Sequence, residues 1–186
     1  MRKNFGSKAI LYPMPVLIIG TYDENGTPNA MNAAWGGISE ENEISICVSD
    51  THKTAENVLK TGAFTVSIAG KSNVTEADYV GIVSGNKEPD KIRKCGWTAV
   101  KSEFVNAPVF EQIPLSLECK LLSYDKDTCR LVGEIVNVSA DESILDNEGK
   151  INPDKFSPIT YDPVNHTYRI LGEVVGKAFS DGKALK

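Results

Sequence analysis

The stretch Pro15-Val16-Leu17-Ile18-Ile19-Gly20-Thr21-Tyr22, followed at once by Asp23-Glu24-Asn25-Gly26, decides the fold. Its first part is rich in β-branched and other apolar residues, which favours a strand. The Asn25-Gly26 pair is a strong signal for a tight turn between antiparallel strands. Residues 28–35 supply the returning strand, so the chain is predicted to open with a β-hairpin.

Further strands are predicted along the rest of the chain. Residues 43–48 alternate polar and apolar side chains, as a half-buried strand does. Asp125-Lys126-Asp127-Thr128 has the composition of a hairpin loop. The other predicted strands are residues 63–68, 97–105, 115–124 and 130–140. Three prolines after residue 150 predict that extended loops dominate the last part of the chain.

The predicted helices are few and short. Apolar residues three and four apart indicate a helix after Thr51, capped by Asp50 or Thr51 and ended by Gly62. Asn73-Val74-Thr75-Glu76 matches a capping box and predicts a second helix. A third helical piece begins at Pro89.

Many short strands with few helices favour an antiparallel barrel. Strands do not alternate with long helices, and neither GxGxxG nor GxxxxGK[ST] occurs, so Rossmann and P-loop folds are disfavoured. We expect residues 1–186 to form one domain, dominated by β-structure.

The overall charge disfavours nucleic-acid binding. The formal net charge is -5, the pI is about 5.1, and no basic run interrupts the acidic balance. The longest apolar run, residues 16–20, is far shorter than a membrane-spanning helix needs. The first residues lack the apolar stretch of a signal peptide, so the expected location is the cytoplasm.

The cysteines and histidines do not predict a metal site. Cys47, Cys95, Cys119 and Cys129 form no CxxC pair, and we expect them to be reduced packing residues. The only histidines, His52 and His166, lie far apart in the sequence.

A candidate anion site lies at Ser49-Asp50-Thr51-His52-Lys53-Thr54, where a strand leads into a helix. A helix N-terminus offers unpaired amides and the positive end of its dipole, which stabilise a phosphate. The hydroxyls of this stretch and Lys53 can add hydrogen bonds. The alternative is an ordinary capped helix whose Lys53 lies in solvent.

A second candidate feature is Asn32-Ala33-Ala34-Trp35-Gly36-Gly37. Small residues let a flat ring approach the backbone, and the Asn32 carboxamide could meet ring heteroatoms. The alternative is a tight core position for the alanines, with Trp35 packed at a strand end and a turn at Gly36-Gly37. The two features together fit a flavin ring and its ribityl phosphate.

At this point the chain resembles the flavin reductase-like family with the FMN-binding split barrel, and most closely its flavoredoxin branch. The matching stretches occur in the family's order and cover nearly the whole chain. They are residues 15–17, 29–35, 52–57, 62–66, 84–85, 90–91, 158–161, 168–172 and 176–179.

The resemblance implies a six-stranded antiparallel split β-barrel with Greek-key connections that forms a homodimer, with FMN near the subunit interface. It places residues of three groups at the cofactor. Asn32, Ala33, Ala34 and Trp35 would border the flavin ring; Ser49, His52, Lys53 and Thr54 would hold the phosphate; Asp78, Tyr79, Lys91 and Tyr161 would line the pocket or the dimer edge. Two positions depart from the family, because many relatives have Arg at His52 and Asn at Ser67.

A bound flavin carries the redox chemistry itself, so no residue is assigned as a general acid or base. The predicted function is NAD(P)H-linked flavin reduction. The alternative is a flavoredoxin-like carrier that passes electrons to a redox partner protein without substrate turnover of its own. A third possibility is a barrel without a redox role that binds another phosphorylated or haem-like ligand.

Overall fold

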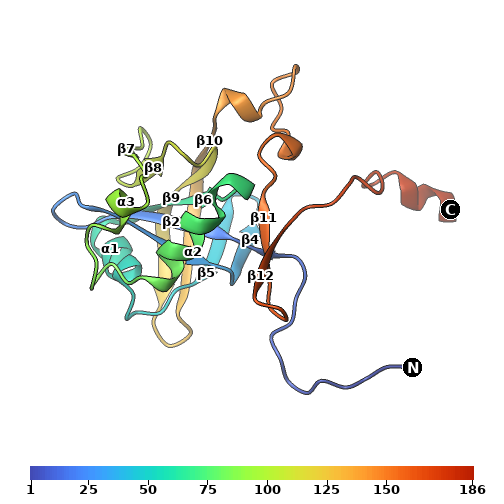
Figure 1. Cartoon of the computed structure of the whole chain (residues 1–186), viewed down its shortest axis with the longest axis horizontal. Helices are drawn as coiled ribbons and strands as arrows, with labels where there is room; N and C mark the ends of the chain where they lie inside the picture. The colour runs from blue at the N-terminus through green and yellow to red at the C-terminus, as the bar shows by residue number, and fades with distance from the viewer.

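The computed structural model describes residues 1–186 and contains one curled antiparallel sheet with a few short helices (Figure 1). The strands of this sheet lie in the order β3-β2-β6-β9-β10-β5-β4. The two edge strands, β3 and β4, follow each other directly in the chain. Residues 34–35 therefore cross the gap between the edges, and the sheet is a split barrel. The seven strands are β2 (Leu17–Tyr22), β3 (Pro28–Ala33), β4 (Gly36–Glu40), β5 (Glu43–Cys47), β6 (Ala63–Ile68), β9 (Leu115–Asp125) and β10 (Arg130–Ala140).

Smaller elements surround the main sheet (Figure 1). A second sheet has the order β1-β11-β12, and a separate hairpin pairs β7 with β8. Helices α1 and α2 both contact β3, and α1 also contacts β2. The bounds are β1 (Met14–Pro15), β7 (Ala99–Lys101), β8 (Pro108–Phe110), β11 (Ile159–Asp162), β12 (Thr167–Ile170), α1 (Lys53–Thr61), α2 (Val74–Ile82) and α3 (Lys91–Lys94).

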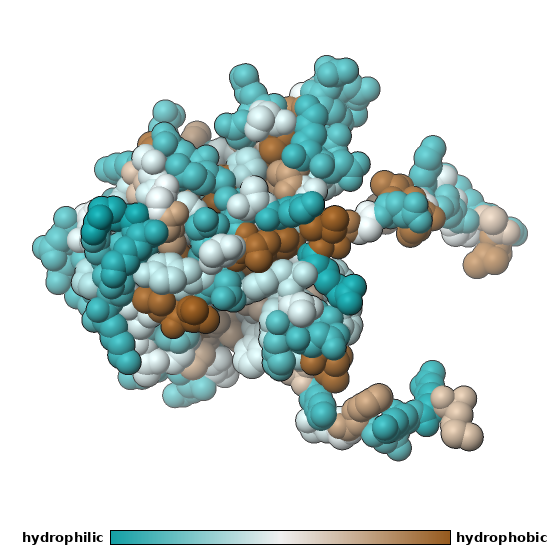
Figure 2. Space-filling model, in the orientation of Figure 1, coloured by the Kyte–Doolittle hydropathy of each residue, from teal (hydrophilic) through white to brown (hydrophobic).

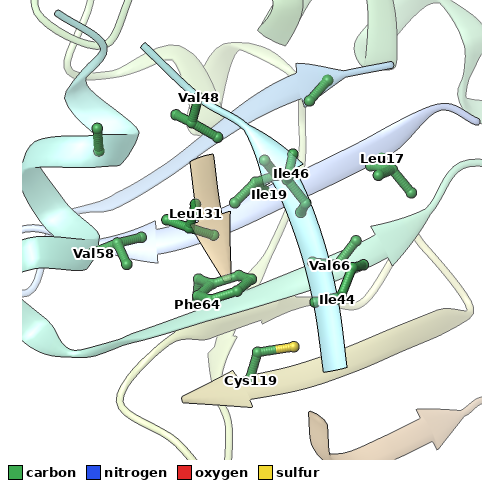
Figure 3. Close-up of a cluster of buried hydrophobic side chains, with 12 residues drawn as sticks. Leu17, Ile19, Ile44, Ile46, Val48, Val58, Phe64, Val66, Cys119 and Leu131 are labelled. Carbon is green, nitrogen blue, oxygen red and sulfur yellow. The ribbon is translucent and has the colours of Figure 1, made fainter. Parts of the chain in front are cut away.

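The apolar run at the start of β2 is buried on both faces, which explains why it does not alternate with polar residues. Leu17 and Ile19 point into the barrel interior with Phe64 and Leu131 (Figure 3). Val16 and Ile18 belong to a second cluster on the opposite face, which includes residues of α2 and α3. The β2–β3 hairpin is thus held from both sides.

Most predicted elements are confirmed, with the fold class. The Asn25-Gly26 turn is present, with Gly26 in the left-handed region at φ 81°. Gly62 ends α1 at φ 70°, and its amide donates to the carbonyl of Val58. Residues 63–68 and 130–140 form β6 and β10 with the predicted bounds.

Several predictions were wrong in detail. Gly36-Gly37 is not a turn but the start of β4, which pairs with β5. The expected loops near residues 159–170 contain β11 and β12, whose hairpin pairs through β11 with β1. The main sheet has seven strands rather than six. The long strand expected at residues 97–105 is reduced to β7.

Both ends of the chain extend away from the body as arms, residues 1–11 and 171–186 (Figure 1). No helix combines the length and the apolar character needed to cross a bilayer.

Candidate functional site

A pocket of about 300 Å³ lies where the N-terminus of α1 meets β3 and the end of α2. We call it the α1 pocket. Side chains from each of these elements and from α3 reach it. The polar side chains that line it include Asn29, Asn32, His52, Lys53, Thr54 and Lys91. The structure therefore brings together residues that lie far apart in the sequence, from Asn29 to Lys91.

The first turn of α1 offers unpaired backbone donors. The helix begins at Lys53, and its N-cap residue His52 makes no side-chain capping bond. The first amide that bonds back into the helix is that of Glu56, which donates to the His52 carbonyl at 3.3 Å. The amides of residues 53–55 have no partner in the chain. A helix end in this state favours an anion.

The predicted cap at Asp50 or Thr51 was wrong. The amide of His52 donates to the Ser49 carbonyl at 3.1 Å, so a turn over residues 49–52 delays the helix. The Thr51 hydroxyl is 3.0 Å from the Ser49 hydroxyl, and the Asp50 carboxylate pairs with Lys126 at 3.1 Å. Neither side chain therefore caps the helix, and its first amides stay free.

Asn29 places a carboxamide with one unpaired polar atom in the pocket wall. The residue is only 6% exposed, its Nδ2 donates to the Thr54 hydroxyl at 3.1 Å, and its Oδ1 has no partner. A threonine hydroxyl can donate as well as accept, so the amide can turn over and present an N–H to the pocket. Either orientation leaves one buried polar atom that a ligand can satisfy.

Gly85 lets the loop after α2 lie directly against this amide. A Cβ atom at position 85 would stand 2.3 Å from Oδ1 of Asn29 and 3.3 Å from Cγ of Lys53. Any side chain would push the loop away from the pocket. Gly85 thus fixes the width of the pocket at its polar end.

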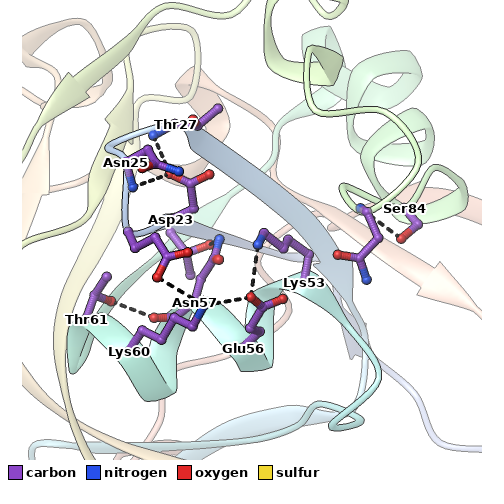
Figure 4. Close-up of polar contacts among 12 residues, drawn as sticks. Asp23, Asn25, Thr27, Lys53, Glu56, Asn57, Lys60, Thr61 and Ser84 are labelled. Carbon is purple, nitrogen blue, oxygen red and sulfur yellow. Dashed lines mark hydrogen bonds and ion pairs between the residues drawn. The ribbon is translucent and has the colours of Figure 1, made fainter.

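Lys53 lines the pocket, and its side chain folds back toward Glu56 rather than extending into solvent. Its Nζ is 3.2 Å from Oε1 of Glu56, and its side chain is 24% exposed. The same Glu56 oxygen accepts from Lys60 at 3.0 Å, and Lys60 also pairs with Glu24 at 3.3 Å (Figure 4). Hydrogen bonds from Lys60 and Lys53 lower the pKa of Glu56, so this carboxylate remains ionised.

Lys91 adds a second positive charge from the other side. Its side chain is buried, and Nζ donates to the Val83 carbonyl at 2.9 Å and the Val80 carbonyl at 3.4 Å. These carbonyls lie at the end of α2, where the dipole favours a cation. Burial nevertheless lowers the pKa of Lys91 to about 8. The group is cationic at neutral pH and becomes neutral in mildly alkaline solution.

The residues predicted to border a flavin ring are divided among three places. Asn32 lines the α1 pocket and donates from Nδ2 to the Ala77 carbonyl at 3.0 Å. Ala33 is buried in the barrel core, so its side chain fits the packing alternative. Ala34 and Trp35 line a different hollow.

This second hollow, the Trp35 hollow, has a volume of about 830 Å³ at the gap between β3 and β4. Leu11, Ile38, Cys47 and Arg130 also line it. Trp35 is 61% exposed, so the alternative in which this ring packs in the core is wrong. Cys47 is also exposed, contrary to the packing role expected for it.

The remaining candidates lie outside the α1 pocket. Ser49 sits in the turn before α1, and Tyr161 is 2.8 Å from the imidazole of His166. The Asp78 carboxylate accepts a hydrogen bond from the Tyr168 hydroxyl at 2.8 Å. Burial is the main cause that raises the pKa of Tyr168 to about 12, and this hydrogen bond is the next largest. Tyr79 is half-buried against the second core cluster. None of these four side chains lines the α1 pocket beside the first turn of α1.

Several pocket residues were absent from the predicted site, and three of these, Asn29, Ser84 and Gly85, fall in stretches that carry the family resemblance. Asn29 could have been found because a buried carboxamide in a strand is costly unless it is paired. Ser84-Gly85 has turn composition, but its contact with β3 depends on tertiary folding.

The flavin reductase like domain is the family whose sequence model matches this chain, over residues 9–170. The chain belongs to the flavin reductase-like family. The resemblance drawn from the sequence is therefore confirmed.

Solved structures of this family share the fold. Flavoredoxin of Desulfovibrio vulgaris is 38% identical, with a TM-score of 0.94 over 98% of this chain and 100% of its own. A flavoredoxin from Methanosarcina acetivorans is 26% identical, with a TM-score of 0.89 and full coverage of both chains, 100% and 100%. An uncharacterised protein of Aquifex aeolicus is 25% identical over 94% of this chain and 89% of its own length. The first of these structures aligns with nearly the whole chain, so the similarity extends beyond the central sheet.

Proposed function

We propose that this flavin reductase-like protein binds FMN with the phosphate in the α1 pocket. The observation that carries the proposal is the set of unpaired backbone amides at residues 53–55, where α1 begins. The Lys53 side chain and the Asn29 carboxamide, one polar atom of which has no partner, lie beside them. A phosphate offers charge and several acceptor oxygens to these groups. Family membership supports the choice of FMN, and one relative with the same fold, from Shewanella baltica, is described as an FMN-binding domain.

Each residue of the pocket then has a defined task. The first-turn amides and Lys53 bind the phosphate, Lys91 contributes charge, and Asn29 donates one further hydrogen bond. Asn32 faces the start of the ring system, and Trp35 lies beyond it at the barrel gap. Bound FMN would supply hydride and single-electron transfer, and the protein would supply position and electrostatics.

We further propose NAD(P)H-linked flavin reduction as the activity. The electron-carrier alternative stays open, because the 38% identity to a flavoredoxin covers 98% of this chain. The protein would act as a homodimer in the cytoplasm. Its four cysteines are free, in keeping with a reducing compartment.

A visible spectrum of freshly purified protein tests the cofactor proposal. We expect blue-light absorption from a chromophore that is released on denaturation and identified as FMN. A colourless protein that fails to bind added FMN would contradict the proposal.

Oxidation of NADH and NADPH by the FMN-loaded protein then separates the two activities. Rapid turnover with free flavin supports the reductase. Tight FMN with negligible turnover supports the carrier.

A further inference from the structure

The C-terminal arm carries large apolar side chains that are almost fully exposed. Val174, Val175 and Leu185 are each more than four-fifths exposed, and Phe179 is 100% exposed. Figure 2 shows the arm projecting well clear of the body, with hydrophobic residues along it. Exposed apolar side chains gathered in this way mark a surface that another molecule covers.

The end of this arm has a definite local shape. The amide of Lys177 donates to Oδ2 of Asp181 at 2.9 Å, and the amides of Ser180 and Asp181 donate to the Lys177 carbonyl at 3.2 and 3.1 Å. Gly176 permits this arrangement, because a Cβ atom there would stand 2.6 Å from Oδ2 of Asp181. A turn organised around Asp181 therefore presents Phe179 outward. Aromatic side chains are common interface anchors, and a preorganised turn lowers the entropic cost of binding.

The Trp35 hollow is the apolar surface that suits such an anchor. Trp35 and Ile38 are 61% and 63% exposed, and Leu11 is 66% exposed. The hollow is also next to the edge strand β4, which has a free side for another chain. Its volume of about 830 Å³ exceeds that of the α1 pocket.

Arm and hollow are close neighbours in the topology. Met14 and Pro15 of β1 line the hollow, β1 pairs with β11, and β11 pairs with β12. The arm begins directly after β12 and runs outward (Figure 1). Two copies related by a two-fold axis can therefore exchange arms, with each arm reaching the hollow of the other copy.

We infer that the C-terminal arm of one copy docks through Phe179 in the Trp35 hollow of a second copy. This inference rests on the homodimer of the proposed function and names the segment that joins its subunits. The partner's arm would then cover the exposed Trp35 ring.

Deletion of residues 173–186 in the full protein tests the inference by light scattering during size-exclusion chromatography. We expect the wild type to be a dimer and the deletion to shift it to a monomer at the same concentration. Phe179→Ala should weaken the dimer roughly thirty-fold, as loss of an interface anchor does. Lys183→Ala is the matched control on the same arm, and it should leave the dimer unchanged.

Disulfide trapping locates the docking site. Under mild oxidation, Ala178→Cys, which keeps Phe179 in place, should form a disulfide between chains with the exposed native Cys47 of the hollow. Adding the Cys47→Ser substitution should abolish this disulfide. Val164→Cys, which places a cysteine at an exposed position outside the arm, should not form a disulfide with Cys47.

Three results would overturn the inference. They are a monomeric wild type, a dimer that survives the deletion unchanged, or an Ala178→Cys to Cys47 disulfide within one chain. The FMN spectrum of the wild type is a separate measurement, so the docking inference and the cofactor proposal can fail independently.

Discussion

The α1 pocket and the Trp35 hollow differ in size and in how fully the residues of one chain enclose them. The α1 pocket is small, enclosed by α1, α2 and β3, and supplied with two lysines and unpaired donors. The Trp35 hollow is larger and open, and it carries an exposed indole at the barrel gap. Under the proposed function, the α1 pocket holds the phosphate within one chain, and the Trp35 hollow is the more open place near the flavin ring.

This difference suggests that one place sets the affinity for FMN and the other sets the reactivity of the bound flavin. The phosphate end should determine whether the cofactor binds, because its charges and donors are preorganised. The ring end should determine what reaches the flavin, because its cover comes from another molecule. Substitutions at the two ends should therefore have different effects.

Lys53→Ala should have the largest effect on binding. Loss of a charged hydrogen bond costs about 1.5–3 kcal/mol, which is roughly a ten- to hundred-fold weaker affinity for FMN. Fluorescence titration with FMN measures it. Lys60→Ala is the control, because Lys60 shares Glu56 with Lys53 but lies outside the α1 pocket. An unchanged affinity in Lys53→Ala would mean that the phosphate lies elsewhere.

Gly85→Ala should come next. The new Cβ would stand 2.3 Å from Oδ1 of Asn29, so the loop must move. Overpacking of this kind costs about 1–3 kcal/mol, and we expect FMN affinity to fall about ten-fold. Gly172→Ala is the control, since nothing lies within 4 Å of its Cβ position. Equal titration curves for the two variants would show that the loop does not border the ligand.

The pH dependence of FMN binding should be smaller. The cationic form of Lys91 favours the phosphate, and the free group has a pKa of about 8. The bound phosphate raises that pKa, so affinity is retained below pH about 8 and falls as the pH rises above it, by at most about ten-fold per pH unit for one proton. Titrations between about pH 7 and pH 10, a range that brackets this pKa, measure the fall.

Lys91→Met is the matched variant for this experiment. It removes the titrating ammonium and should flatten the curve. A wild-type curve that is equally flat would show that Lys91 does not sense the phosphate.

Asn32→Leu should have the smallest effect. It removes the hydrogen bond to the Ala77 carbonyl, which contributes about 1 kcal/mol, and should reduce FMN loading by a few-fold with little change in folding. Thermal unfolding of the cofactor-free variant provides the comparison. A large fall in its melting temperature would instead assign Asn32 to core packing.

The sequence predicted the parts of this molecule whose structure is set locally. The Asn25-Gly26 turn, the Gly62 helix end and the alternation of β5 depend on neighbouring residues. The start of α1 could not be predicted to the residue, because the turn between Ser49 and His52 competes with a capping bond. β4 was missed because its glycines resemble a turn until β5 pairs with them.

The sequence predicted the chemical groups of the candidate site, but not that they would be divided between two separate hollows and the core. Lys53 and Thr54 lie in the pocket because the strand-to-helix junction places them there. Ala33 turns into the core while Ala34 and Trp35 reach a different hollow, a separation created by the barrel gap. The contribution of Asn29 and Gly85 arises only when the loop after α2 packs on β3.

A crystal structure of the protein with FMN tests the central claim most directly. We predict the phosphate within hydrogen-bonding distance of the amides of residues 53–55, with Lys53 in contact. A phosphate bound elsewhere, or Lys53 turned away into solvent beside bound FMN, would contradict the account.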